Sequence, residues 1–360
     1  MSGPTDGPVR KRVAVIEGDD ASPEAVQPTI ALLDAMGLPI DWDYPVVGEP
    51  AVAGYGSPFP AESRALIDAA DTTFFGATSG SSSAALFYLR WGRETYANVR
   101  PARYLSGARS PLADPEGIDL VIVRENLEDL YVRAEGELST LADPAPRGVT
   151  IRRSVKDLAP GRYAIKAITQ AGSERVIRFA FELARARRGQ LTVTAKYNML
   201  PQSDGLFRDV ALSLAQEYPD VDLETFIVDD FACRLVREPR RFDVVVMPNL
   251  YGDILSDAAA GLVGGLGLAP SGCYGDSYAY FETAHGTAPD IAGTHTINPT
   301  ANLLTAAMML DHLELRAAAD RLRAAIEQVY RDGRVLTPDQ GGTAGTEAFC
   351  AEVARHLQCV

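Results

Sequence analysis

Few cysteines and no long apolar run occur in this sequence of 360 residues. The four cysteines, Cys233, Cys273, Cys350 and Cys359, show no Cys-x-x-Cys spacing, so we expect reduced thiols rather than a zinc site or a disulfide framework. No segment approaches the roughly 18 apolar residues that a membrane-spanning helix needs. Residues 1–12 also lack the apolar core of a signal peptide. These absences predict a cytoplasmic protein without a membrane partner.

Basic charge is scarce as well. The chain has 34 Lys and Arg residues against 48 Asp and Glu residues, so a nucleic acid is not an expected partner. No Gly-x-Gly-x-x-Gly follows the first expected strand at residues 13–16, so the usual dinucleotide fingerprint is missing. The glycines at residues 261–267 do not follow a strand, and we expect them to serve helix packing and a turn.

Short apolar runs that alternate with helical patterns are present along most of the chain. They predict a layered α/β protein with a length suited to about two domains. The pattern at residues 302–330 predicts one long core helix. Residues 136–153, which include Val149-Thr150-Ile151, predict an exposed hairpin arm, with a plain surface loop as the alternative. The further strands are expected at residues 72–75, 120–123, 191–195, 223–228 and 242–247, and the clearest helices at 23–36 and 173–187.

Two aspartates, Asp253 and Asp257, follow the expected strand at residues 242–247. Their spacing of four places both carboxylates on one face of a helix, at the strand end where open α/β sheets bind ligands. Close carboxylates repel one another unless a cation lies between them, so the pair predicts a divalent metal site. A solvated acidic helix face is the alternative.

Arginines form a second group of candidate site residues. Arg90, Arg100 and Arg124 each lie beside a break in the apolar pattern. Guanidinium groups bind carboxylates through two bonds, so convergence of the three would suit a dicarboxylic or tricarboxylic acid. Ordinary surface salt bridges are the alternative.

A series of segments then occurs in an order that covers nearly the whole chain. Together they resemble the β-decarboxylating dehydrogenases of 2-hydroxy acids, the isocitrate/isopropylmalate dehydrogenase family, and most of all its homoisocitrate members. The segments are Tyr-Ala-Asn-Val-Arg-Pro (96–101), Val-Arg-Glu-Asn-Leu-Glu-Asp-Leu-Tyr (123–131), Lys-Tyr-Asn (196–198), Val-Asp (228–229), Asn-Leu-Tyr-Gly-Asp-Ile-Leu-Ser-Asp (249–257) and His-Gly-Thr-Ala-Pro-Asp-Ile-Ala-Gly (285–293).

The resemblance implies an α/β, isopropylmalate-dehydrogenase-like fold of two domains with a large mixed sheet, not a Rossmann fold. Residues 1–97 plus 265–360 would form the cofactor-side domain. Residues 98–264 would form the substrate, metal and dimerisation domain, with a hairpin arm near 132–155. It also implies a homodimer with shared active sites.

The chemistry implied is the NAD-dependent oxidative decarboxylation of a 3-substituted malate. Asp253, Asp257 and the partner subunit's Asp229 would hold Mg²⁺ or Mn²⁺. Lys196 would assist removal of the hydroxyl proton, and Tyr131 would return a proton to the enolate carbon.

Ligand-binding positions follow from the same resemblance. Asp290 would accept hydrogen bonds from a ribose diol and repel a 2′-phosphate, which favours NAD over NADP. The substrate-binding positions are Arg90, Arg100, Arg124, Ser81, Ser82, Ser83, Leu86 and Asn198. The cofactor-binding positions are Thr78, Glu282, His285, Gly286, Thr287, Ala288, Pro289, Asp290 and Asn298.

The sequence departs from the family pattern in three places. Residues 18–24 lack two glycines of the usual Gly-Asp-Gly-Ile-Gly-Pro-Glu, and Thr-Ala replaces Pro-Val before His285. The loop at residues 78–88 has neither the Ser and Asn of isocitrate enzymes, whose places Ala84 and Leu86 take, nor the longer arginine-bearing loop of homoisocitrate enzymes.

The substituent at C3 of the malate therefore stays open. Ser81 to Ser83 could donate to an acidic group, as on homoisocitrate or isocitrate, or on a phosphonomethylmalate-type analogue of specialised metabolism. They could also form a flexible loop. Leu86 is similar to the apolar position of isopropylmalate dehydrogenases, and malate and tartrate are further alternatives. A non-catalytic regulatory subunit is the alternative from a different class.

Overall fold

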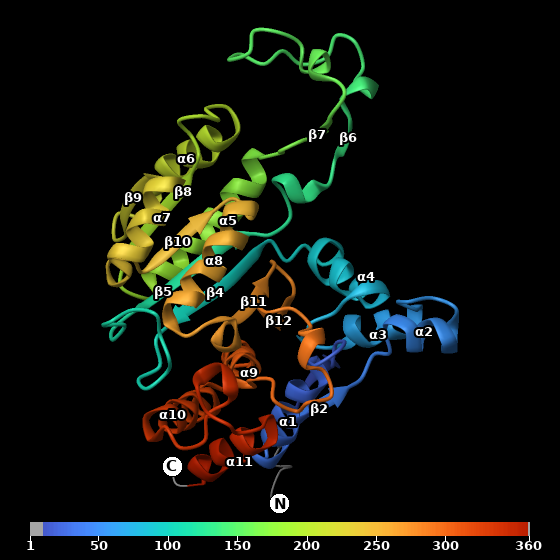
Figure 1. Cartoon of the computed structure of the whole chain (residues 1–360), viewed down its shortest axis with the longest axis vertical. Helices are drawn as coiled ribbons and strands as arrows, with labels where there is room; N and C mark the ends of the chain where they lie inside the picture. Colours follow the sequence, from blue (N-terminus) through green and yellow to red (C-terminus); the bar gives the residue numbers. More distant parts are fainter. Residues whose placement is uncertain (1–9, 359–360) are drawn as a thin grey trace, which may run out of the picture.

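A single mixed sheet dominates the computed structural model, which describes residues 10–358 (Figure 1). The sheet has ten strands in the order β2-β1-β3-β12-β11-β4-β5-β10-β8-β9, so the large mixed sheet predicted from the sequence is confirmed. The polar residues 1–9 and Cys359 lie outside the described residues. The strands are β1 Lys11–Ile16, β2 Ile40–Asp43, β3 Thr72–Phe75, β4 Ala97–Arg103, β5 Asp119–Glu125, β8 Gln190–Ala195, β9 Asp222–Ile227, β10 Val244–Met247, β11 Pro270–Tyr274 and β12 Ala279–Thr283.

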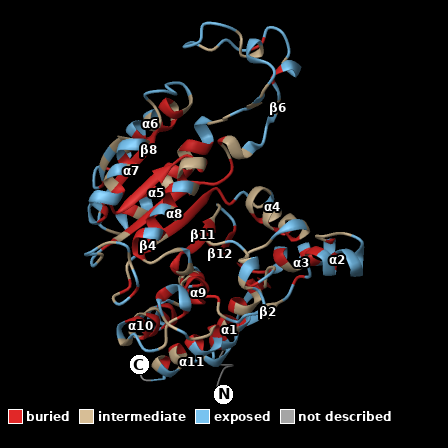
Figure 2. Cartoon of the chain, viewed as in Figure 1, coloured by how far each residue is buried: buried red, intermediate tan, exposed pale blue. Residues whose placement is uncertain are grey.

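Parallel strands form both outer parts of the sheet, and antiparallel pairs join them in the middle. β12 pairs with β11, β11 with β4 and β4 with β5 in antiparallel fashion, whereas β5, β10, β8 and β9 run parallel. Parallel strands are usually covered on both faces, and the central strands are indeed buried (Figure 2). The division into two domains at the boundaries given above remains a proposal.

Helices cover the sheet in separate groups, each with its own apolar core. α1, α9, α10 and α11 pack on the β1-β3-β12 side, α5 and α6 on one face of β5, β10 and β8, and α7 and α8 on the other face. The short helices α2, α3 and α4 lie at the right of the view in Figure 1. The helices are α1 Ser22–Ala35, α2 Gly48–Tyr55, α3 Ala61–Ala69, α4 Ser83–Phe87, α5 Gln170–Arg185, α6 Ser203–Leu214, α7 Val228–Arg237, α8 Asn249–Val263, α9 Thr300–His312, α10 Arg316–Asp332 and α11 Thr346–Leu357.

The expected single helix over residues 302–330 is wrong. The chain forms α9 and α10 with a turn between them. Glu314 has a φ of 65° there, a left-handed conformation that a helix interior does not allow. Leu313 and the partly buried Leu315 still pack on the same core, which is why the apolar spacing continues through the break.

The hairpin arm exists, but its boundaries and its strand differ from the prediction. Its strands are β6 Glu135–Glu137 and β7 Arg162–Ala164, so the arm extends beyond residue 155. Residues 149–151 form a turn rather than a strand, and Val149 is 93% exposed. The arm projects from the body of the molecule as a thin, mostly exposed excursion (Figures 1 and 2).

Among the described residues, no helix combines the length and apolar character needed to cross a bilayer.

Candidate active site

Helix α8, which follows strand β10, carries both Asp253 and Asp257, as the sequence predicts. Gly252 allows α8 to lie directly against β5, because a Cβ at this position would be 2.6 Å from Cβ and Cγ of Arg124. Along β5, Ile122 packs toward α7 and α8 while Val123 packs toward α5 and α6. Side chains alternate along a strand, so Arg124 faces α8 and meets Asp253.

A partly buried cluster forms where β4, β5 and α8 meet, with Arg100 and Arg124 buried and the carboxylates half-buried. Arg124 donates from Nη1 to Asp253 and from Nε to Asn249 Oδ1 at 2.9 Å. The hydroxyl of Tyr131 donates to Asp253 as well. Arg100 Nη1 lies 3.1 Å from Asp257 Oδ1 and 3.4 Å from Asp253 Oδ1. The sequence-predicted Arg100, Arg124, Tyr131, Asp253 and Asp257 are thus brought together.

The pKa values of Asp253 and Asp257 are shifted in opposite directions. Burial would raise the pKa of Asp253, but Arg124, the Tyr131 hydrogen bond and Arg100 outweigh it and hold that pKa below its ordinary value. Burial raises the pKa of Asp257 despite the opposing effect of Arg100, with repulsion from Asp253 adding to it. Burial and repulsion from Arg100 lower the pKa of Arg124 to about 10.

Several buried donors around this cluster have no hydrogen-bond partner. Among the described residues these include Arg124 Nη2, Arg90 Nε and Asn98 Nδ2. Arg90 is held by Glu282, with Nη2 3.1 Å from Oε1, and its charge also acts on Asp253. A buried donor without a partner is costly, so these atoms mark a place that an anionic ligand would complete.

The donor set also fits a hard divalent cation. Asp253 and Asp257 both approach one point, the Nη1 atom of Arg100, and carboxylate oxygens are the ligands that Mg²⁺ and Mn²⁺ prefer. Within residues 10–358, no third acidic, His or Cys side chain is near enough to share a metal with them. Further ligands would have to come from outside the chain, from substrate or from water.

Lys196 and Asp229 form a separate ion pair. Lys196 follows β8 and Asp229 lies in the first turn of α7. Neither makes a hydrogen bond or ion pair with Tyr131, Asp253 or Asp257 in the described chain, and Asn198 is exposed. Lys196 and Asp229 therefore pair with each other rather than with the cluster around Asp253.

Two of the three serines at residues 81–83 already donate hydrogen bonds within the chain. Ser81 Oγ donates to Glu49 at 2.8 Å, and Ser82 Oγ donates to Asp19 at 3.0 Å. Those hydroxyl protons are therefore used within the chain. Ser83, at the start of α4, has no such partner among the described side chains, and Leu86 is partly buried.

The predicted cofactor loop borders a cavity of about 370 Å³. Thr287 lies in this loop, and its backbone oxygen accepts a hydrogen bond from Ala21 N at 3.0 Å. Pro289 and Asp290 lie on an exposed turn beside the cavity, and Thr78 Oγ1 is buried without a partner. The lining residues are Gly267, His285, Gly286, Ala288, Ile291, Thr296, Ile297, Asn298, Pro338 and Asp339.

Asp339 was missed by the sequence analysis. It comes from a distant segment and accepts a hydrogen bond from Asn298 Nδ2 at 2.9 Å. Asp339 lies between α10 and α11, and no local pattern of the sequence marks it. It adds a second carboxylate to the region of Asp290.

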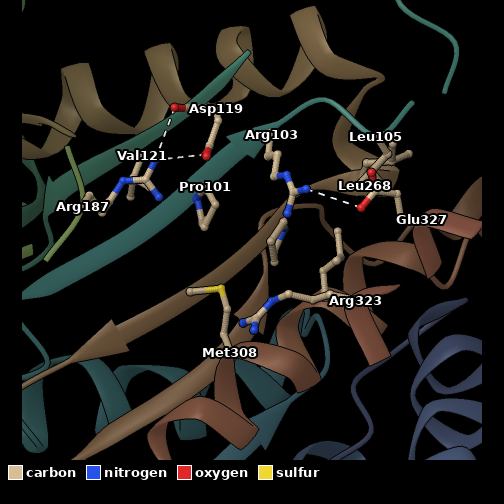
Figure 3. A pocket seen from close by; sticks show the side chains of 12 residues that line it. Pro101, Arg103, Leu105, Asp119, Val121, Arg187, Leu268, Met308, Arg323 and Glu327 are labelled. Atoms are coloured by element: carbon tan, nitrogen blue, oxygen red, sulfur yellow. Dashed lines mark hydrogen bonds and ion pairs between the residues drawn. The ribbon is translucent and has the colours of Figure 1, made fainter. Parts of the chain in front are cut away.

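A different cavity of about 260 Å³ lies near β4 and β5 and does not belong to this site (Figure 3). Val121 lines it and packs toward the face of the sheet opposite that of Arg124. Arg187 is paired with Asp119 at 2.9 Å, and Arg103 with Glu327 at 3.4 Å. None of the predicted site residues lines this cavity.

Comparisons with known proteins identify the family of the chain. Residues 12–357 match the isocitrate/isopropylmalate dehydrogenase family. The chain is 40% identical to a 3-isopropylmalate/3-methylmalate dehydrogenase of Methanocaldococcus jannaschii, over 96% of this chain and 99% of the relative. It is 42% identical to an isocitrate/homoisocitrate dehydrogenase of Thermus thermophilus, over 96% and 98%. A solved isocitrate dehydrogenase from Methylococcus capsulatus has a TM-score of 0.85 at 36% identity, covering 97% of this chain and 99% of the other. The chain therefore belongs to the isocitrate/isopropylmalate dehydrogenase family, whose members are decarboxylating hydroxy-acid dehydrogenases.

Proposed function

We propose that this chain catalyses the NAD-dependent and metal-dependent oxidative decarboxylation of a 3-substituted malate. The observation that carries the proposal is the partly buried cluster of Arg100, Arg124 and Tyr131 around Asp253, with buried guanidinium donors left unpaired beside it. Such donors suit the two carboxylates of a malate. A structural salt-bridge cluster would instead satisfy its donors within the protein.

Each residue has a task in the proposed reaction. Arg90, Arg100 and Arg124 bind and orient the malate carboxylates. Bound NAD would accept the hydride from C2, while Mg²⁺ or Mn²⁺ held by Asp253 and Asp257 would polarise the substrate oxygen. Lys196 takes the proton of the C2 hydroxyl. The bond between C3 and its carboxylate then breaks with loss of carbon dioxide, and Tyr131 gives a proton to C3.

NAD is proposed over NADP because Asp290 and Asp339 both place carboxylates beside the cofactor cavity. Negative charge there disfavours a 2′-phosphate. Family membership alone leaves the choice open, since matching relatives include proteins named for NAD and for NADP.

Two substituent classes at C3 follow from the loop at residues 78–88. An acidic group, as in homoisocitrate, isocitrate or a phosphonomethylmalate-type analogue, would use Ser83, whose hydroxyl is free among the described side chains. An apolar group, as in isopropylmalate, is favoured by Leu86 and by the engagement of Ser81 and Ser82 with acidic residues of their own chain.

The test is NADH formation with Mg²⁺ across malates that bear hydrogen, isopropyl, carboxymethyl, carboxyethyl or phosphonomethyl at C3. Turnover of one class supports the proposal and identifies the substituent. Absence of turnover with every substrate would favour the regulatory-subunit alternative.

A homodimer with shared sites is proposed because the resemblance implies one, and because Lys196 and Asp229 make no hydrogen bond or ion pair with Tyr131 or Asp253 of the same chain among the described residues. In such a dimer, Lys196 and Asp229 of the partner subunit complete each site. Inactive Lys196→Met and Tyr131→Phe chains, unfolded together and refolded, should then regain about a quarter of the wild-type activity, since half the dimers carry one intact site. Mixtures that stay inactive would argue for sites built within single chains.

A further inference from the structure

Lys166 lies at the root of the arm, two residues after β7, and pairs with two buried carboxylates. Its Nζ is 3.0 Å from Asp204 Oδ2 and 3.5 Å from Asp129 Oδ1. The ammonium also donates to the hydroxyl of Tyr251 at 3.2 Å. The side chain of Lys166 is 15% exposed and both aspartate side chains are fully buried. None of these residues was predicted to belong to the site.

Each aspartate in turn holds backbone that leads to a predicted catalytic group. Asp204 Oδ1 accepts from the backbone N–H of Lys196 at 3.0 Å. Asp129 Oδ1 accepts from the N–H of Leu130 at 2.8 Å, one residue before Tyr131. Asp129 Oδ2 accepts from Leu250 N at 3.0 Å, in the first turn of α8, which carries Asp253.

The backbone conformation of Asp129 depends on its contacts with Lys166 and Ala167. Asp129 has a φ of 67°, which is uncommon for a residue with a side chain and persists only where surrounding bonds hold it. Its backbone N–H donates to Ala167 O at 2.8 Å, and Ala167 N–H donates back at 3.3 Å. Lys166 and its neighbour Ala167 thus hold Asp129 through both side chain and backbone.

Lys166 supplies the positive charge that these buried aspartates need. Burial alone would lower the pKa of Lys166, but Asp129 and Asp204 outweigh that effect and raise it. Without the ammonium, two buried carboxylates would face each other without a counterion and would move apart or take up water.

We propose that Lys166 is a positioning residue that fixes the segments carrying Tyr131, Lys196 and the start of α8 relative to one another. The inference rests on the proposed function, because it assigns Lys166 to the same reaction. If Lys196 serves the site of the partner subunit, as proposed above, Lys166 also links the two sites of a dimer.

The test compares Lys166→Met with a matched control, Arg187→Met. Arg187 Nε lies 2.7 Å from Asp243 Oδ1, and Asp243 is also fully buried, but it precedes β10 at the end of the strand away from α8. Both substitutions remove a cation from a buried aspartate, so both should lower the melting temperature. Displacement of reacting groups by about 1 Å can cost about 100-fold in rate. We therefore expect kcat to fall 10- to 100-fold in K166M, with KM for NAD within about twofold of wild type. In R187M, kcat should stay within about twofold.

The charge-conserving Lys166→Arg should restore kcat to within about fivefold of wild type. If K166M does not fold, as judged by circular dichroism, Tyr251→Phe decides instead, because it removes one bond of Lys166 and leaves the charges balanced. A fall in kcat of threefold or more at unchanged KM for NAD in Y251F supports the proposal.

Equal kcat losses in K166M and R187M, or an unchanged kcat in Y251F, would overturn the positioning role while wild-type turnover still upheld the proposed function. A wild-type protein that turns over none of the malates would instead remove the proposed function itself.

Discussion

Gly252→Ala provides a direct test of how α8 places the acidic pair. The new Cβ would lie 2.6 Å from Cβ and Cγ of Arg124 and 3.0 Å from its Cα, whereas ordinary contacts begin at 3.4 Å. Helix and strand must therefore separate by about 0.8 Å (3.4 − 2.6), because the nearest atoms are the inflexible base of the side chain. Overpacking of this kind costs about 1–3 kcal/mol of stability.

The consequence for activity follows from the same displacement. Asp253 is the next residue, and its contacts with Arg124 and Tyr131 depend on the spacing between α8 and β5. A shift approaching 1 Å at reacting groups can cost about 100-fold in rate. We therefore expect kcat/KM to fall by one to two orders of magnitude, and the Mg²⁺ concentration for half-maximal rate to rise.

A matched control lies in the same helix. Gly261 has no atom within 4 Å of the position a Cβ would take, so Gly261→Ala should leave activity unchanged and stabilise the helix by about 0.5–1 kcal/mol. Initial rates across a Mg²⁺ titration and urea unfolding of both variants measure these effects. Wild-type metal dependence and stability in G252A would refute the close packing of α8 on β5 as the basis of the site.

Three further predictions concern single carboxyl groups. Asp253→Asn should abolish metal-dependent NADH formation while the circular dichroism spectrum stays that of the wild type; retained activity would remove the metal assignment. Asp290→Asn should reduce the ratio of kcat/KM for NAD to that for NADP at least tenfold, and equal use of both cofactors by the wild type would contradict the role of Asp290. Burial raises the pKa of Glu125 from 4.5 to about 7, against the hydrogen bonds from Leu127 N and Glu128 N. Between those pH values the folded chain holds a proton that the unfolded chain releases, so the free energy of unfolding should fall as pH rises, by at most about 1.4 kcal/mol per pH unit. Glu125→Gln should remove that slope in urea unfolding from pH 5 to 8; an unchanged slope would assign it to other groups.

Strands that consist of one continuous apolar run, and the helices that follow them, were predictable from the sequence. β3 occupies the predicted residues 72–75, and β10 followed by α8 appears as expected. Buried parallel strands leave continuous apolar runs, which sequence patterns detect well. The break at Glu314 was not detectable, because its left-handed φ is not accompanied by a glycine or proline and the leucines on both sides continue the helical spacing.

The sequence named candidate site residues, and the structure brings five of them together, but their arrangement was not predictable. That Arg124 meets Asp253 depends on β5 lying beside β10 in the sheet, and strand order is not contained in residue spacing. The engagement of Ser81 by Glu49 and of Ser82 by Asp19 depends on segments more than 30 residues away in the chain. Lys166 was missed because nothing local distinguishes a buried lysine from a solvated one.

The antiparallel pairing of β4 with β11 has a consequence for how the protein melts. Gly272, Cys273 and Tyr274 are in register with Val99, Asn98 and Ala97, so backbone hydrogen bonds rather than a flexible linker join the two halves of the sheet. If either half unfolded alone, it would leave the other with a long unpaired strand edge, a surface that invites aggregation. Unfolding of one half would therefore break the β4–β11 hydrogen bonds and destabilise the other half. This coupling favours a single cooperative unfolding transition of the whole sheet.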